Sequence, residues 1–146
     1  MNVKTFLATA AIASATLGAV AYAESDNPTI QARQQAMKTI GQNFKIVGDT
    51  AKGTMEFDAA ALQAALTTIS ETAATVPALF EEEVVDPESD ASDKIWANWD
   101  DFVTKAGALE AAAADAAGMV SGPDDLGAVM GSVGGACGAC HKAYKL

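Results

Sequence analysis

Two cysteines and the chain's single histidine lie together near the C-terminus. Cys137, Cys140 and His141 form a C-x-x-C-H motif, the spacing at which two thiols can add to the two vinyl groups of one porphyrin. Residues three apart on a helix project from the same face, so both sulfurs would meet one edge of a flat ring. His141 would then offer a neutral imidazole to the iron. The motif predicts one covalently attached haem c with His141 as its proximal ligand.

Two other uses of a C-x-x-C pair are weaker alternatives. Thiol oxidoreductases carry the pair at a helix N-terminus beside a βαβ unit, whereas here the pair lies at the end of a predicted helix. A zinc site needs four ligands, and the chain has no second cysteine or histidine pair, although a carboxylate could supply one ligand. A dithiol redox protein stays open as the third hypothesis.

The N-terminus has the features of a secretory signal. Lys4 precedes an apolar stretch, and Ala21-Tyr22-Ala23 offers the small-x-small pattern that signal peptidase cleaves. We expect residues 1–23 to be removed and residues 24–146 to form one periplasmic domain that does not insert into the membrane. The formal net charge of −10 disfavours binding to nucleic acid and to anionic membranes.

The alanine-rich sequence without sustained alternation predicts an all-α fold. We expect helices over about 28–52, from Asp58 as N-cap to about Val76, over 95–116, and from about Pro123 to the C-terminus, with a turn from Gly118 to Pro123. The predicted buried stripe of the second helix is Leu62, Leu66, Ile69, Ala73 and Val76. Residues 81–93 are acidic and aperiodic and predict an exposed crossover loop. Four such helices favour an antiparallel four-helix bundle with the haem at one end. The predicted inward stripe of the first helix is Ile30, Arg33, Met37, Ile40, Phe44, Val47 and Ala51.

The last predicted helix is unusually rich in glycine. Each glycine costs a helix about 1 kcal/mol relative to alanine, so this many call for a structural reason. We interpret them as room for a bulky flat group lying against the backbone. The five positions are Gly127, Gly131, Gly134, Gly135 and Gly138.

Several motifs together resemble the class II c-type cytochromes, the cytochrome c′ family, over the whole mature domain. The attachment motif near the C-terminus is the most specific of them, because ordinary class I cytochromes carry it near the N-terminus. The resemblance implies an antiparallel four-helix bundle, commonly dimeric, with haem at one end. The matching segments are Arg33-Gln34 with Met37, Pro77 to Phe80, Ile95-Trp96 with Phe102, and Cys137 to His141 with Tyr144 and Lys145.

The resemblance also implies roles for individual residues. Arg33 and Gln34 match positions that contact the haem and its propionates, and Asp90 matches a loop position near the haem edge. Lys145 stands where many family members have arginine, so it keeps the charge but loses the planar fork. Independently of the family, Arg33 lies on an inward stripe, where a charge needs a partner, and a propionate is a suitable one.

Met37 decides between two functions that the resemblance allows. If its thioether binds the iron opposite His141, the protein is a periplasmic electron carrier that meets redox partner proteins. If Met37 only covers an open position, the protein binds nitric oxide or carbon monoxide at five-coordinate iron. Neither makes the chain a conventional enzyme, and a homodimer is compatible with both. The other aromatic and thioether candidates are interpreted as packing or surface residues: Met55, Met119, Met130, Trp96 and Trp99.

Overall fold

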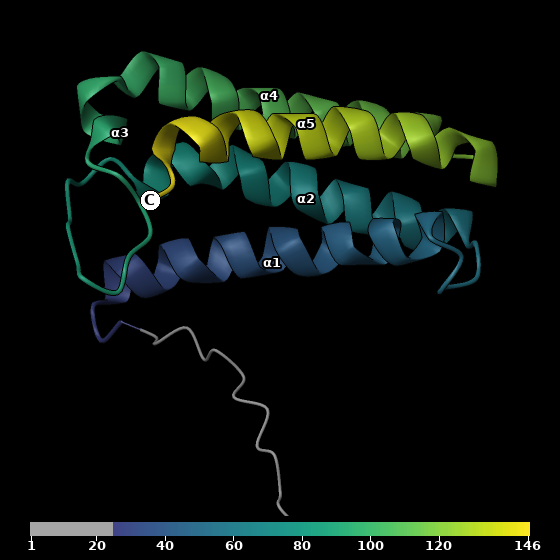
Figure 1. Ribbon diagram of the computed structural model, residues 1–146, viewed down its shortest axis with the longest axis horizontal. Helices are drawn as coiled ribbons and strands as arrows, with labels where there is room; N and C mark the ends of the chain where they lie inside the picture. Colours follow the sequence, from purple (N-terminus) through teal and green to yellow (C-terminus); the bar gives the residue numbers. More distant parts are fainter. Residues whose placement is uncertain (1–24) are drawn as a thin grey trace, which may run out of the picture.

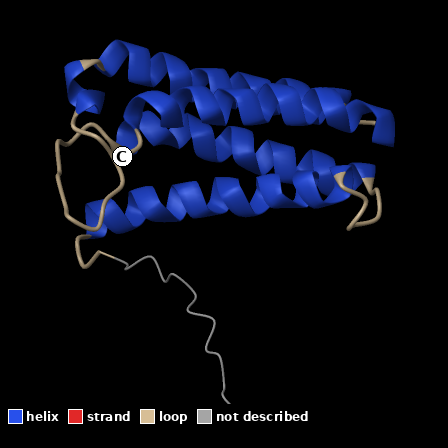
Figure 2. Cartoon of the chain, in the orientation of Figure 1, coloured by secondary structure: helices blue, strands red, loops and turns tan. Residues whose placement is uncertain are grey.

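Four long helices lie antiparallel and side by side (Figures 1 and 2). The computed structural model describes residues 25–146, so the predicted signal over residues 1–23 lies outside the described part. The all-α four-helix bundle is confirmed. None of the helices described combines the length and apolarity that crossing a bilayer requires. The elements in order are α1 (Pro28–Ala51), α2 (Ala59–Leu79), α3 (Lys94–Ala97), α4 (Trp99–Met119), the short 3₁₀ helix η1 (Pro123–Asp125) and α5 (Leu126–Tyr144).

The helix ends follow the expected local chemistry. The Asn27 side chain caps α1 by accepting a hydrogen bond of 2.9 Å from the N–H two residues on, and Pro28 occupies the first turn. Asp58 caps α2 as predicted, at 2.9 and 3.1 Å. Gly53 follows α1 with φ of 73°, a left-handed conformation that favours glycine. Pro77 lies inside the last turn of α2.

The prediction of one continuous third helix is wrong. Asn98 leaves the helical region, with φ −133° and ψ 44°, and divides the segment into α3 and α4. Its side-chain Nδ2 donates to the carbonyl of Lys94 at 3.0 Å, a local bond that competes with helix continuation. The predicted turn from Gly118 also begins too early, because α4 continues to Met119.

The buried core runs along all four long helices. The predicted α2 stripe of Leu62, Leu66, Ile69, Ala73 and Val76 is buried throughout. The α1 stripe is wrong at two positions, since Met37 is 38% exposed and Ala51 is exposed. The reason is that α1 packs chiefly against α2, which leaves its other flank, where Met37 lies, partly uncovered.

Candidate haem site

The attachment motif occupies the last turns of α5. Cys137 and Cys140 are half-buried free thiols, and His141 is exposed. The C-terminal end of α5 and the beginning of α1 lie at the same end of the bundle (Figure 1). We call this the haem end and the opposite one the closed end. Cys140 also packs against the buried core, which anchors the motif to the bundle.

The surroundings of the motif favour neutral groups. Burial raises the pKa of both thiols, with Lys105 opposing this at Cys140. Burial, assisted by the charge of Lys145, lowers the pKa of His141. Neutral imidazole is the form that binds iron. A raised thiol pKa makes a thiolate less available than it is in dithiol redox proteins.

Two close approaches set the register between α1 and α5. A Cβ placed on Gly48 would lie 3.8 Å from Met130 Cε, and one on Gly134 would lie 3.2 Å from Phe44 Cζ. The second pair is four residues nearer the haem end on each helix. If this antiparallel register continued unchanged toward the haem end, Gly41 would come opposite Cys137 and Met37 opposite His141.

The residues at this end fit a covalently held haem. Two thiols stand at the required spacing on α5, with an imidazole directly after them. On α1, a Cβ placed on Gly41 would meet nothing within 4 Å. The arrangement therefore offers attachment and one imidazole ligand, and a thioether ligand from Met37 stays a prediction.

The structure gives Arg33 a set of partners within the protein. Arg33 is 3% exposed, and its guanidinium donates to the carbonyls of Leu79 at 2.9 Å, Val84 at 3.0 Å and Glu82 at 2.6 Å. It also lies 4.4 Å from the centroid of the Phe80 ring, a favourable cation–π distance. Burial lowers the pKa of Arg33 and the charge of Glu82 opposes this. Arg33 thus holds the start of the crossover loop, and its contact with a propionate stays a prediction.

Gln34 and Asp90 also engage the chain itself. Gln34 Nε2 donates to the carbonyl of Glu88 at 3.1 Å, while its Oε1 is buried without a hydrogen-bond partner in the described part of the chain. Asp90 forms an exposed ion pair with Lys145 at 3.4 Å. Both residues lie at the same end of the bundle as the attachment motif, and their predicted contacts with haem stay predictions.

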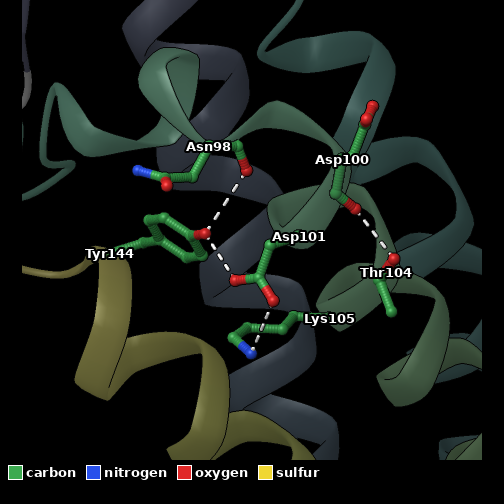
Figure 3. A network of polar contacts seen from close by, with 6 residues as sticks. All are labelled: Asn98, Asp100, Asp101, Thr104, Lys105 and Tyr144. Atoms are coloured by element: carbon green, nitrogen blue, oxygen red, sulfur yellow. Dashed lines mark hydrogen bonds and ion pairs between the residues drawn. The ribbon is translucent and has the colours of Figure 1, made fainter.

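Sequence reasoning missed a polar network beside the motif. The Tyr144 hydroxyl donates to Asp101 Oδ2 at 2.5 Å, and Lys105 Nζ donates to Asp101 Oδ1 at 3.2 Å (Figure 3). The bond to Asp101 raises the pKa of Tyr144 to about 12 and lowers the pKa of Asp101. The sequence contained evidence for this network. Asp101 and Lys105 are four residues apart on a helix, the spacing of an ion pair, and Tyr144 places a hydroxyl that needs a hydrogen-bond partner on an inward stripe.

The crossover loop, residues 81–93, joins both sides of the haem end. On the α5 side, Ser92 N donates to Tyr144 O at 2.9 Å and Leu146 N donates to Asp90 O at 2.8 Å, with an antiparallel bridge between Ala91 and Lys145. Arg33 holds the other side from α1. The loop runs along this end of the bundle (Figure 2), so it connects the helix bearing Met37 to the one bearing His141.

The glycines of α5 receive one structural explanation. Phe44 packs so closely on Gly134 that a side chain there would be crowded, at 3.2 Å. At the other four positions a Cβ would meet nothing within 4 Å in the described residues. Their interpretation as clearance for a flat group stays a prediction.

The fold and this site define a class of protein, a helical-bundle c-type cytochrome whose attachment motif lies in its last helix. The family model described as Cytochrome C' matches residues 28–145, and the chain belongs to that family. Cytochrome c-556 of Agrobacterium tumefaciens (strain apple 185) is 38% identical over 123 residues, which cover 84% of this chain and 98% of that protein. Cytochrome c' of Rhodopseudomonas palustris is 31% identical over 128 residues, covering 85% and 86%.

Solved structures agree with these sequence relationships. The structure of oxidised R. palustris cytochrome c556 matches with a TM-score of 0.76 at 35% identity, covering 82% of this chain and 96% of that one. The R. palustris cytochrome c' matches with a TM-score of 0.77 at 30% identity, covering 83% and 98%. The predicted family, the four-helix fold and the covalent haem c are therefore confirmed, and the chain is a monohaem electron-transfer cytochrome.

Proposed function

We propose that this cytochrome is exported to the periplasm and carries single electrons through iron held between His141 and Met37, without catalytic turnover. One observation carries the proposal, namely the register of α1 against α5. The approaches of Gly48 to Met130 and of Phe44 to Gly134, if continued seven residues further along both helices, would bring the Met37 thioether into line with the His141 imidazole.

The chain's residues would divide the work as follows. Bound haem supplies a one-electron redox couple, and a His/Met pair raises its reduction potential. Cys137 and Cys140 each add sulfur to one vinyl carbon and hydrogen to the other, so no atom leaves. His141 contributes a neutral imidazole, consistent with its lowered pKa. A Met37 thioether held against the iron in both oxidation states would keep rearrangement small.

Charge indicates the kind of redox partner. The chain has a formal net charge of −10, and opposite charge steers encounter between proteins. A partner with a basic docking face fits this surface, and the rate of electron exchange with it should fall as salt is added.

A second function is favoured by the exposure of Met37. At 38% exposed, Met37 is not locked into the core and can act as a movable lid over an open iron position. Among the solved relatives is a nitric oxide complex of a variant of cytochrome c prime from Alcaligenes xylosoxidans, with a TM-score of 0.70 and 28% identity. The alternative function is binding of nitric oxide or carbon monoxide by five-coordinate iron.

Optical spectra of the purified holoprotein separate the two functions. Electron transfer through His141 and Met37 requires a low-spin ferric spectrum with a thioether-to-iron charge-transfer band. Met37→Ala should lose that band and gain rapid carbon monoxide binding, whereas Met55→Ala, at an exposed position, should change neither. A high-spin ferric spectrum in the unmodified protein, with ready carbon monoxide binding, would replace the first function by the second.

Export has its own test. The mature protein isolated from the periplasm should begin at Glu24 and weigh more than its amino acids by one haem. A chain that keeps residues 1–23, or that stays in the cytoplasm, contradicts the proposed location without affecting the assignment of the axial ligands.

A further inference from the structure

Gly41 is a helix-interior glycine that the described protein does not itself require. It lies in the middle of α1 (Pro28–Ala51) and is exposed. Its φ is not in the left-handed region, since Gly53 is the one residue with positive φ in the described part of the chain. A Cβ at Gly41 would meet nothing within 4 Å. Glycine is a poor helix former, so this position costs stability without a backbone or packing reason.

The position of Gly41 in the α1–α5 register supplies a reason. Phe44 meets Gly134, and the same register counted three residues further toward the haem end would place Gly41 opposite Cys137. On α1 the next residue of that face, four positions earlier, is Met37. In this register α1 would pass the group that Cys137 holds at Gly41.

We infer that Gly41 is a positioning residue for the haem: its missing side chain gives the macrocycle room beside α1 and so lets Met37 reach the iron. A side chain here would press on the attached ring and push α1 away from α5. Because Met37 lies one turn along the same helix, its sulfur would move away from the iron. The inference rests on the proposed haem site: room for the macrocycle beside Gly41 is common to both proposed functions, whereas the effect on Met37 ligation belongs to the first.

Gly107 provides a matched control. It is also an exposed glycine inside a long helix, α4, and a Cβ there would likewise meet nothing within 4 Å. Gly107 follows the buried Ala106 and belongs to a helix that carries none of the residues assigned to the iron or the thioethers. Gly107→Ala should therefore show the ordinary gain of replacing a helical glycine, a rise of about 4 °C in Tm.

The experiment compares Gly41→Ala with Gly107→Ala in the holoprotein. We expect Gly41→Ala to lower Tm instead of raising it, to weaken the thioether-to-iron band and to speed carbon monoxide binding at least tenfold. Gly41→Val should enlarge each effect. A merely structural role for Gly41 would change Tm alone and leave the band and the carbon monoxide rate as they are.

The outcomes separate this inference from the proposed function. If Gly41→Ala raises Tm as much as Gly107→Ala and leaves both spectra and ligand binding unchanged, the inference is overturned while Met37 ligation stands. If the unmodified protein has no thioether-to-iron band, the proposal that Met37 binds the iron is wrong. The role of Gly41 is then tested by comparing the Tm of Gly41→Ala with that of Gly107→Ala and by the position of the Soret band. A lowered Tm with a shifted Soret band supports the inference in that case too.

Discussion

The two ends of the bundle are held together in different ways. At the closed end, fully buried aliphatic side chains from several helices pack on one another, among them Val47, Leu62 and Val129. A side-chain hydrogen bond adds to this packing: Gln63 Nε2 of α2 donates to the carbonyl of Val120, directly after α4, at 3.0 Å. Apolar burial is non-directional, so this end contributes stability chiefly through the apolar area that it removes from water.

The haem end depends on aromatic and polar contacts. The Phe102 ring lies 5.1 Å from that of Phe80 and 5.5 Å, edge-on, from that of Tyr144. Trp96 Nε1 donates to Phe80 O at 2.8 Å, and Arg33 donates to three carbonyls. Directional contacts can fix the separation of two helices while leaving the space between them open. The comparison indicates that stability and site geometry are partly separable in this molecule.

The largest effect on stability should come from the closed end and should leave the iron unaffected. Leu62 is 1% exposed, and Leu62→Ala removes buried methyl groups and leaves a cavity, at a cost of about 3 kcal/mol. Urea unfolding of the holoprotein measures this loss. The spectra and the reduction potential should stay as in the unmodified protein.

Leu146→Ala makes the same substitution at an 81% exposed position and should change the unfolding free energy little. If Leu62→Ala alters the thioether-to-iron band, the two ends are coupled and the proposed separation is wrong.

The next effect should come from Arg33 and should appear in both stability and spectrum. Arg33→Met keeps much of the apolar stem but leaves three carbonyls without their donor, at a cost of about 2 kcal/mol. Because those carbonyls belong to the crossover loop and the end of α2, the loop should loosen and Met37 ligation weaken. Calorimetry and the ferric spectrum measure the two consequences.

Lys38→Met is the matched control, since Lys38 is exposed on the same helix. Arg33→Lys should restore part of the stability, because an ammonium keeps the charge but cannot reach three carbonyls in a planar fork. An Arg33→Met protein that unfolds earlier with an unchanged spectrum would limit Arg33 to a role in stability.

Sequence patterns predicted the closed end better than the haem end. The α2 stripe and the Asp58 cap depend on local periodicity and side-chain chemistry, and both were found. The sequence alone was enough to select Cys137, Cys140 and His141 as candidates, because attachment of haem through two thioethers requires one particular spacing. Met37 was predicted on the inward stripe and lies partly exposed, because helical periodicity does not say which neighbour covers which part of a face.

The contacts across the haem end were beyond sequence reasoning. The carbonyls that Arg33 binds are backbone groups, which leave no trace in residue types, and the pairing of Ala91 with Lys145 brings together residues far apart in the chain. The break at Asn98 depends on one side chain competing for a helix carbonyl. A charged residue on an inward stripe, such as Arg33, predicts only that a polar partner exists and does not say which group it is.

A smaller and pH-dependent effect is expected at Tyr144. Its pKa is raised from the ordinary 10.0 to about 12 by the bond to Asp101, so the folded state retains a proton that the unfolded state releases. The resulting stability is present below about pH 10 and is lost as pH rises toward 12. Tyr144→Phe removes this contribution, so its Tm should fall less steeply across that range.

Tm measured from pH 9 to about 12 tests the expectation for Tyr144. At acid pH the lowered pKa of Asp101 implies a contribution to folding stability that is lost as the pH falls below the ordinary pKa of 3.8. Tyr144→Phe should therefore also make Tm depend less steeply on pH in that acid range. Asp100→Asn changes an exposed neighbour whose backbone carbonyl, and not its side chain, makes a contact drawn in Figure 3, so it should keep the alkaline slope of the unmodified protein. Parallel alkaline curves for Tyr144→Phe and the unmodified protein would contradict the assigned cause.

The smallest effect should come from Lys145, although it lies four residues after the proximal ligand. Its ion pair with Asp90 is 3.4 Å long, with side chains 45% and 53% exposed, and such pairs contribute at most about 0.5 kcal/mol. The backbone bonds from Ser92 to Tyr144 and from Leu146 to Asp90 remain in Lys145→Met. Urea unfolding should therefore place Lys145→Met within about 0.5 kcal/mol of Lys142→Met, and added salt should remove the difference. A loss several times larger would mean that charge, rather than backbone pairing, holds the crossover loop against α5.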